Sequence, residues 1–222
     1  MIGIIDYGIG NIKSVALAVE EVSAKEDVVV SNDPKLLINA EKLILPGVCS
    51  YSACMDGLKR YKLDDLIKSR VVNDNVPILG ICIGLHVLST AGFEFGETKG
   101  LNLIPGYVKP IEAYRVPHMG WNQCKSIKNS IVFGKDAEYY YFAHSYHYVP
   151  DDLSVVSLMT TFGLEVVAAI EYNNIFGCQF HPERSGDKGL EIISNFINNH
   201  NNNMNKAPKF DSIIKKEDSY VR

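Results

Sequence analysis

Residues 77–85 read Pro-Ile-Leu-Gly-Ile-Cys-Ile-Gly-Leu, and the rest of the chain is best interpreted outward from them. The apolar run after Pro77 predicts a buried strand, and the Gly-x-Cys-x-Gly pattern predicts a sharp turn from that strand into a helix. Gly80 and Gly84 permit such a turn because they have no Cβ atom to clash. The helix N-terminus would face Cys82, where its partial positive charge favours a thiolate. We therefore expect a nucleophilic cysteine, the alternative being a small cysteine buried in a core strand.

The sequence on either side of this turn alternates between buried strands and helices. In the first half, apolar runs at 2–5, 28–30, 43–45 and 78–81 alternate with helical patterns at 12–22 and 63–72. This alternation is typical of a parallel sheet covered on both faces. In the second half, closely spaced strands are expected at 139–143, 155–158, 166–171 and 175–180, and a last helix at 190–197. The predicted fold class is α/β: three layers, with a mostly parallel central sheet flanked by helices and extended by antiparallel strands.

The composition is typical of a compact globular chain. It has 222 residues, 46% of them hydrophobic, and a net charge of −4 with both signs interspersed. Because there is no basic block, nucleic acid and anionic membranes are not expected as partners. The uncharged stretch 76–93 is long enough for a membrane span, but its Pro, Gly and polar residues favour a buried strand that runs into a helix. We expect one domain over 1–200 and a polar tail, flexible or a short helix, over 201–222.

The cysteines and the N-terminus indicate the compartment. The five cysteines, Cys49, Cys54, Cys82, Cys124 and Cys178, are an odd number and contain no CxxC pair. Neither a disulfide framework nor a zinc site is therefore expected. The N-terminal MIGIIDYG has no basic region before a long apolar one, so it predicts a first strand and not a signal peptide. We expect a cytoplasmic protein without a metal.

A nucleophilic thiol needs a base, and the base needs an acceptor that orients it. His181 and Glu183 follow the strand expected at 175–180 and are separated by Pro182. In an extended segment, residues two apart project to the same side, so Glu183 can hold one imidazole nitrogen while the other faces Cys82. A single histidine is more often structural, but a cysteine followed by His-x-Glu at a strand end in an α/β sheet favours catalysis.

Acyl transfer also needs donors for the oxyanion of the tetrahedral intermediate. The stretch Leu45-Pro46-Gly47-Val48-Cys49 closes the preceding strand, where its backbone amides can supply one donor. The backbone around Leu85, at the start of the helix after Cys82, is the other candidate. A plain strand-to-helix turn is the alternative for residues 45–49.

The blocks Gly80-Ile81-Cys82-Ile83-Gly84, Leu45-Pro46-Gly47-Val48 and Gln179-Phe180-His181-Pro182-Glu183 together resemble the class I glutamine amidotransferases, a family with a Cys-His-Glu triad. Other blocks are similar to one branch of that family, the glutaminase subunits of imidazole glycerol phosphate synthases. These are Asp6-Tyr7-Gly8 with Gly10-Asn11, Pro117-His118-Met119-Gly120-Trp121-Asn122, Tyr141-Phe142 with His144-Ser145-Tyr146, and His181-Pro182-Glu183-Arg184-Ser185. The resemblance runs from Met1 to about Asn198.

The resemblance implies a role for each matching residue. Cys82 would attack the side-chain amide of glutamine and form a glutamyl thioester, His181 would carry the proton to the departing ammonia, and Glu183 would orient His181. The residues implied in substrate binding are Gly47, Val48, His86, His144, Ser145 and Tyr146. Asn11, Met119 and Trp121 would lie at the interface of a heterodimer with a (β/α)8 barrel cyclase. That partner would use the ammonia to make imidazole glycerol phosphate and aminoimidazole carboxamide ribotide in histidine biosynthesis, and no cofactor is implied.

Two positions depart from the family pattern. His86 stands where the family usually has Gln, and an imidazole offers fewer hydrogen-bond donors than an amide. Cys49 stands where the family usually has Gly, and its side chain restricts the positive-φ conformations that a flipping oxyanion peptide would use. These departures leave two alternatives open: a paralogous subunit that supplies ammonia for the amidation of a surface sugar, or a docking subunit without catalytic activity.

Other motifs indicate less. Gly8-Ile9-Gly10 lacks the third glycine of a dinucleotide-binding loop, because Lys13 stands in its place. His144 and His147 have no carboxylate cluster near them in the sequence, which argues against a metal site.

Overall fold

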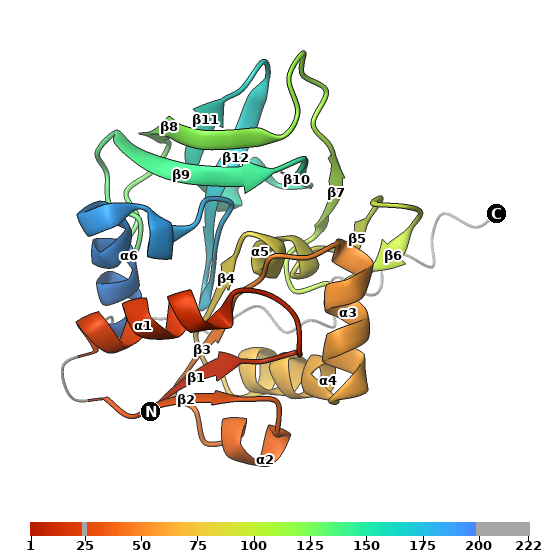
Figure 1. The fold of residues 1–222 in the computed structure, drawn as a ribbon, viewed down its shortest axis with the longest axis vertical. Coiled ribbons are helices and arrows are strands. Elements are labelled where there is room, and N and C mark those ends of the chain that lie inside the picture. Colours follow the sequence, from red (N-terminus) through yellow and green to blue (C-terminus); the bar gives the residue numbers. More distant parts are fainter. Residues whose placement is uncertain (24–25, 199–222) are drawn as a thin grey trace.

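A computed structural model describes residues 1–23 and 26–198. Its larger sheet has the strand order β2 (Val28–Ser31), β1 (Ile2–Ile5), β3 (Lys42–Leu45), β4 (Ile78–Ile81), β13 (Ile175–Cys178), β12 (Glu165–Tyr172), β11 (Val156–Thr161), β8 (His118–Ser126) and β9 (Glu138–His144). Neighbours from β2 to β13 pair in parallel. Neighbours from β13 to β9 pair antiparallel. Figure 1 shows the parallel half below and the antiparallel half above, so the expected α/β class is confirmed.

Helices cover both faces of the parallel half. On one face α1 (Ile12–Val22) packs beside α6 (Gly186–Asn198). On the other face lie α3 (Tyr51–Arg60), α4 (Leu63–Lys68) and α5 (Ile83–Val87). A short helix, α2 (Pro34–Leu37), connects β2 to β3 and begins with Asp33, whose carboxylate accepts a hydrogen bond from the backbone amide of Lys35.

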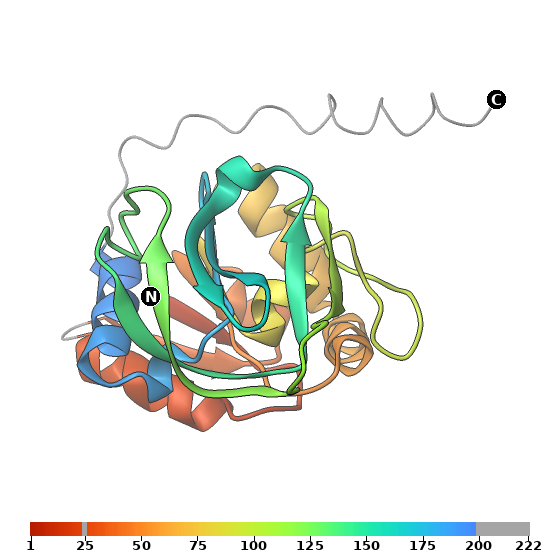
Figure 2. The ribbon, with the colours of Figure 1, turned by 90° about the horizontal axis from the view of Figure 1, so that it is seen from above.

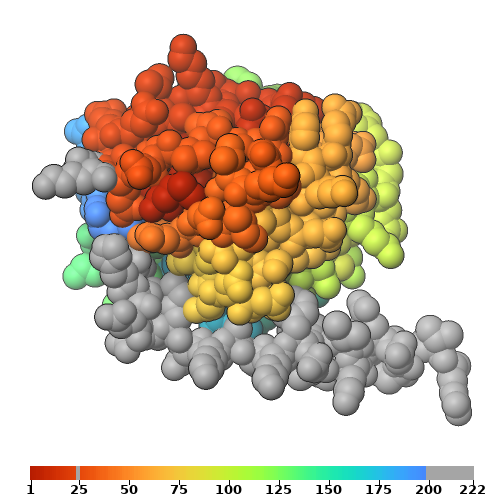
Figure 3. Space-filling model, turned by 90° about the horizontal axis from the view of Figure 1, so that it is seen from below, coloured from red at the N-terminus to blue at the C-terminus, as the bar shows by residue number. Residues whose placement is uncertain are grey.

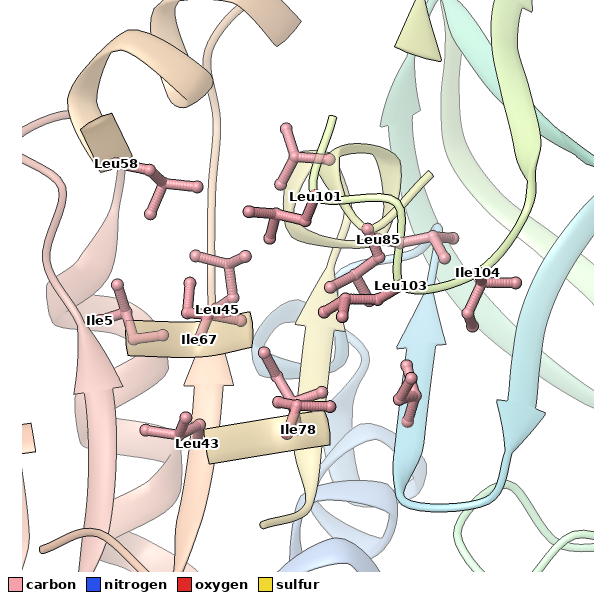
Figure 4. Packing of buried hydrophobic residues seen from close by; sticks show 14 of the residues in the cluster. Ile5, Leu43, Leu45, Leu58, Ile67, Ile78, Leu85, Leu101, Leu103 and Ile104 are labelled. Carbon is pink, nitrogen blue, oxygen red and sulfur yellow. The ribbon is translucent and has the colours of Figure 1, made fainter. Parts of the chain in front are cut away.

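The core consists of two apolar layers, one on each side of the parallel strands. In β3, Ile44 packs in the layer under α1 and α6, whereas Leu43 and Leu45 pack in the layer under α3, α4 and α5. Figure 4 shows the second layer, in which Ile78 and Leu85 meet side chains from the neighbouring strands and helices. Strands with both faces buried explain why the sequence has continuous apolar runs here instead of alternation.

A second, four-stranded sheet was not predicted, and neither was α3. This sheet has the order β10 (Tyr146–Pro150), β7 (Gly106–Pro110), β5 (Ala91–Gly92) and β6 (Thr98–Lys99). Two of its strands have only two residues each, which is too short for a recognisable periodicity. Because β9 ends at His144 in one sheet and β10 begins at Tyr146 in the other, Ser145 lies where the chain passes between the sheets.

Several predicted boundaries need correction. The helix expected at 63–72 is α4 followed by a π-helical turn, η1 (Ser69–Asn73). The strand expected from 155 begins at Val156, after a 3-10 turn, η2 (Leu153–Val155). The strand expected to reach 180 ends at Cys178. The tail expected at 201–222 lies outside the described residues. Within the part of the chain that the structure describes, none of the helices has the length and apolar character of a membrane span.

Two other views place these halves in space. Seen from above, in Figure 2, the antiparallel strands β8, β9 and β11 lie over the parallel strands and their helices. The view from below in Figure 3 shows a face formed mostly by the first third of the chain, coloured red to yellow. In Figure 1 the carboxyl ends of β3 and β4 point toward the antiparallel half, so the loops that follow these strands lie next to it.

Candidate active site

The candidate nucleophile lies at the predicted sharp turn. Cys82 follows β4 directly and is the N-cap residue of α5, with φ 53° and ψ −107°. A residue with a side chain rarely adopts a positive φ, and such a conformation costs about 1–3 kcal/mol unless the surroundings hold it. Here the backbone amide of Cys82 donates to the carbonyl of Cys178 in β13, and its carbonyl accepts from His86 in α5. The strand and the helix thus hold the thiol at the bend.

The two other candidate catalytic residues lie beyond the end of β13. His181 is extended (φ −100°, ψ 97°), but the chain then turns at once into the 3-10 turn η3 (Pro182–Arg184). The expected fully extended segment is therefore wrong at Glu183, although the two side chains still meet: His181 Nδ1 lies 2.9 Å from Glu183 Oε1. Backbone hydrogen bonds of His181 with Tyr141 and with the Ser185 hydroxyl fix the position of the imidazole.

Electrostatics favour a charged imidazole beside the thiol. Burial lowers the pKa of His181, but the neighbouring Cys82 and Glu183 raise it by more, so that the pKa is about 10. A pKa raised in this way means that His181 is protonated at neutral pH and loses its proton only as the pH rises toward that value. The Glu183 side chain is buried, and its second oxygen, Oε2, has no hydrogen-bond partner among residues 1–23 and 26–198, so its charge is directed at the imidazolium. An imidazolium next to a thiol favours the thiolate.

A pocket of about 200 Å³ opens over the sulfur. Its walls come from the loops after β3 and β5, from α5, and from the segment between β9 and β10. The lining residues are Val48, Cys49, Cys82, Ile83, His86, Glu94, Pro117, Met119, Ala143, His144, Ser145 and Tyr146. Five of the six predicted binding residues are among them, and the sixth, Gly47, precedes Val48 in the chain.

The pocket wall also contains a carboxylate that sequence reasoning missed. Glu94 follows β5, and its Oε2 accepts a hydrogen bond of 2.7 Å from the backbone amide of Tyr51, at the start of α3. No motif marks Glu94, because it belongs to a short loop between two very short strands. It gives the pocket a negative charge, which suits an ammonium group of a ligand.

The two predicted oxyanion segments each have a residue at the pocket, although Leu85 itself is not one of the lining residues. Val48 and Ile83 line the same pocket as Cys82. In α5 the backbone amide of His86 donates a hydrogen bond to the Cys82 carbonyl. The amides that precede it in the first turn, including that of Leu85, do not take part in this hydrogen bond. The loop after β3 is packed closely, because a Cβ on Gly47 would lie 2.2 Å from the Tyr7 hydroxyl.

The histidines of the pocket wall are neutral. Burial lowers the pKa of His144, and its Nδ1 lies 2.8 Å from the carbonyl of Tyr146, to which it donates. Its other nitrogen, Nε2, lies 2.9 Å from Nδ1 of His118, a ring stacked between Phe142 and Phe162. His144 is thus held in one orientation by β8 and β10 together. Among the described residues, no three His, Cys, Asp or Glu side chains are arranged to hold a metal ion.

The three predicted partner residues are exposed. In β8, Met119 and Trp121 are 65% and 57% exposed, and Asn11 is exposed just before α1. Met119 also lines the pocket, so the pocket reaches this exposed face. Trp121 meets the ring of Tyr141 edge-on, and the Arg184 guanidinium covers that ring at 4.3 Å.

Known proteins resemble the chain along most of its length. The family model described as "Glutamine amidotransferase class-I" matches residues 3–199. The "Imidazole glycerol phosphate synthase subunit HisH" of Pelagibacter ubique is 40% identical over 203 residues, with 88% of this chain and 98% of the relative covered. The protein of the same name from Geobacter sulfurreducens is 43% identical over 205 residues, with 88% and 97% covered. A solved structure, "Structure of PurLQS from Thermotoga maritima", shares the fold with a TM-score of 0.69 at 20% identity, over 89% of this chain and 97% of that one.

Proposed function

Because this chain belongs to the class I glutamine amidotransferase family, we propose that it is the glutaminase subunit of an imidazole glycerol phosphate synthase. It hydrolyses glutamine to glutamate and passes the ammonia to a cyclase subunit in histidine biosynthesis. The observation that carries the proposal is the position of His181, which pairs with Glu183 at 2.9 Å and whose pKa is raised by the neighbouring Cys82 at a pocket of about 200 Å³. We place the complex in the cytoplasm, where this biosynthesis would occur.

The proposed reaction begins with the thiolate of Cys82. Its sulfur attacks the carboxamide carbon of glutamine, and the resulting oxyanion accepts hydrogen bonds from backbone amides near Val48 and Ile83. The intermediate collapses when the carbon–nitrogen bond breaks and the nitrogen takes the proton of the His181 imidazolium, which releases ammonia and leaves a thioester. The neutral His181 then takes a proton from water, whose oxygen attacks the thioester carbon and releases glutamate and the thiol.

The pocket wall is suited to the amino-acid end of glutamine. Glu94 carries a negative charge that complements an α-ammonium group. The neutral His144 and the segment Ser145–Tyr146 would hold the remaining polar groups without a competing charge.

The proposed partner is a (β/α)8 barrel cyclase that binds over Met119, Trp121 and Asn11. Free ammonia is mostly protonated at pH 7 and is then not nucleophilic, so direct transfer to the second active site has a chemical advantage. Met119 supports this arrangement, because it belongs both to the pocket wall and to the exposed face of β8. An assembled interface would close the mouth of the pocket against water.

The proposal is tested by measuring glutamate release from the full chain mixed with the cyclase of the same organism and its substrate. We expect glutamate to form with the partner present, and we expect the pair together to restore growth of a histidine auxotroph. The absence of glutamate at saturating partner would contradict a glutaminase. Glutamate release without restored growth would instead place the ammonia in another pathway, such as amidation of a surface sugar.

The Trp121→Ala variant tests the interface. Exposed tryptophans are enriched among the residues that dominate binding energy, so we expect binding to the cyclase to weaken by about 2 kcal/mol, or about 30-fold in Kd. Isothermal calorimetry measures the change. Leu36→Ala is the matched control, because Leu36 is 53% exposed on α2, at the opposite end of the molecule from β8 in Figure 1. Equal affinities for Trp121→Ala and the unmodified chain would rule out this face.

A further inference from the structure

A buried amide lies between the nucleophile and His86. Gln179 follows β13 two residues before His181, and its side chain is fully buried. Its Nε2 lies 3.8 Å from Cys82 Sγ, and its Oε1 lies 2.6 Å from His86 Nε2. The two ends of one amide therefore contact two residues of the pocket wall.

We propose that Gln179 is a catalytic residue that donates an amide hydrogen to the Cys82 thiolate, and that His86 is a positioning residue that holds this amide in place. The inference rests on the function proposed above, since it concerns the same nucleophile. It assigns a role to a side chain that sequence analysis treated only as part of a motif. It also gives a physical meaning to the histidine that replaces the glutamine usual in the family.

The direction of the amide follows from the charge on the sulfur. A thiolate accepts hydrogen bonds and donates none, so the NH2 end of the amide must face Cys82. With the amide reversed, the carbonyl oxygen would face the negative sulfur and be repelled. The correct orientation directs Oε1 at His86, and a carbonyl oxygen only accepts hydrogen bonds. His86 must therefore carry its proton on Nε2.

The environment of His86 supplies that protonation state. The imidazole is 4% exposed, and burial lowers its pKa to about 4 against the opposing effect of the Gln179 hydrogen bond. At neutral pH the ring thus has one proton, and the 2.6 Å contact with Gln179 Oε1 places it on Nε2. A glutamine at this position can donate the same bond from its own amide. His86 thus keeps the donor toward Gln179 and leaves Nδ1 as an acceptor.

Other titratable groups also face the sulfur and remain unchanged in the test. From the end of β13 these are Cys178, His181 and Glu183, and from the pocket wall they are Cys49, Glu94 and His144. Because none of these groups is altered in the Gln179 and His86 variants, their effects on the sulfur are common to every measurement. The contribution of Gln179 is therefore measured as a shift between variants that all retain the triad.

The test measures the rate at which iodoacetamide alkylates Cys82 in the full-length chain, as a function of pH and resolved by peptide mass spectrometry. A hydrogen bond to a charged group contributes about 1.5–3 kcal/mol, so we expect Gln179→Leu to slow alkylation at pH 7 about tenfold and to move the pH midpoint upward by about one unit. Gln179→Glu keeps the size but places an oxygen at the sulfur, so we expect a larger shift in the same direction.

Variants of His86 test the positioning role. His86→Leu removes the donor to Gln179 Oε1 and is expected to slow alkylation about threefold, with the pH midpoint moved upward. His86→Gln can still donate to that oxygen and is the matched control, expected to lie within about twofold of the unmodified chain. An unchanged pH midpoint in a folded Gln179→Leu variant would overturn the inference. If the Gln179 variants do not fold, the two His86 variants provide the test, and equal alkylation rates for His86→Leu and His86→Gln would overturn the inference.

The same measurement separates this inference from the proposed function. If Cys82 in the unmodified chain reacts no faster at pH 7 than a cysteine in an unstructured peptide, the proposed nucleophile itself is contradicted. If Cys82 is selectively reactive but insensitive to Gln179 and His86, only the present inference fails.

Discussion

Replacing Cys82 with alanine is expected to lower glutamine-dependent synthesis by the complex at least about 10⁴-fold, while ammonia-dependent synthesis by the partner stays within about twofold of normal. Cys82 is the proposed thioester-forming group at the turn after β4, so without its sulfur we expect no route from glutamine to ammonia, and Cys49, although it lines the same pocket, follows a different strand and is not expected to replace it. Added ammonia bypasses this step because the cyclase site is intact. Steady-state rates with each nitrogen source, measured on the assembled complex, give both numbers.

A second cysteine provides the control for this variant. Cys124 in β8 is fully buried in the core layer and, unlike Cys82, does not line the pocket. Cys124→Ala removes a sulfur from packing and is expected to lower stability without separating the two activities. An equal loss of the glutamine and ammonia reactions in Cys82→Ala would refute the assigned role.

The second large effect is expected from Gly84→Ala. A Cβ at Gly84 would lie 1.8 Å from the backbone carbonyl oxygen of Leu45, at the end of β3. That oxygen belongs to a central strand and cannot rotate away as a flexible side chain would. Helix α5 must therefore move, and we expect the free energy of unfolding to fall by about 3 kcal/mol or more. Because Gly47 and Val48 follow Leu45 after a single residue, Pro46, the proposed oxyanion segment should also shift.

Chemical denaturation measures this effect against a glycine in open space. Gly134 has φ 74°, and a Cβ built there meets no atom within 4 Å. Asparagine tolerates this conformation, so Gly134→Asn should cost less than about 1 kcal/mol. If Gly84→Ala unfolds at the same denaturant concentration as the unmodified chain, the close packing of α5 on β3 is not a constraint on this fold.

Much of the fold was predictable because its parallel strands are buried on both faces. The runs around Ile4, Ile44 and Leu79 are apolar throughout, which only a sheet covered on both sides requires. Helix α3 was not predicted, although Ser50 is a favourable N-cap residue. Its hydroxyl accepts a hydrogen bond from the backbone amide of Ala53. Its sequence contains Gly57, whose absent Cβ allows the helix to lie against Tyr7, a contact that no local pattern reveals.

The same distinction applies to the candidate site. Cys82, His181 and Glu183 stand in short motifs whose spacing already expresses their chemistry, so they were predictable as candidates. Glu94 was not, because it reaches the pocket through a loop and is identified only by its contact with the start of α3. The contact between Gln179 and His86 joins residues 93 positions apart, and a motif around either one does not indicate it.

The chain's own pattern of apolar runs, glycines and one cysteine at a strand end was sufficient to predict a layered α/β sheet with a candidate nucleophile at its carboxyl edge. Those features are local, since burial and backbone geometry act on neighbouring residues. The three-dimensional arrangement was needed to establish that the imidazole lies at the sulfur, that Glu94 enters the pocket, and that an amide bridges the sulfur to His86. Hydrogen bonds and charges act over a few ångströms in space, whatever the separation along the chain, so no order of residues can express them.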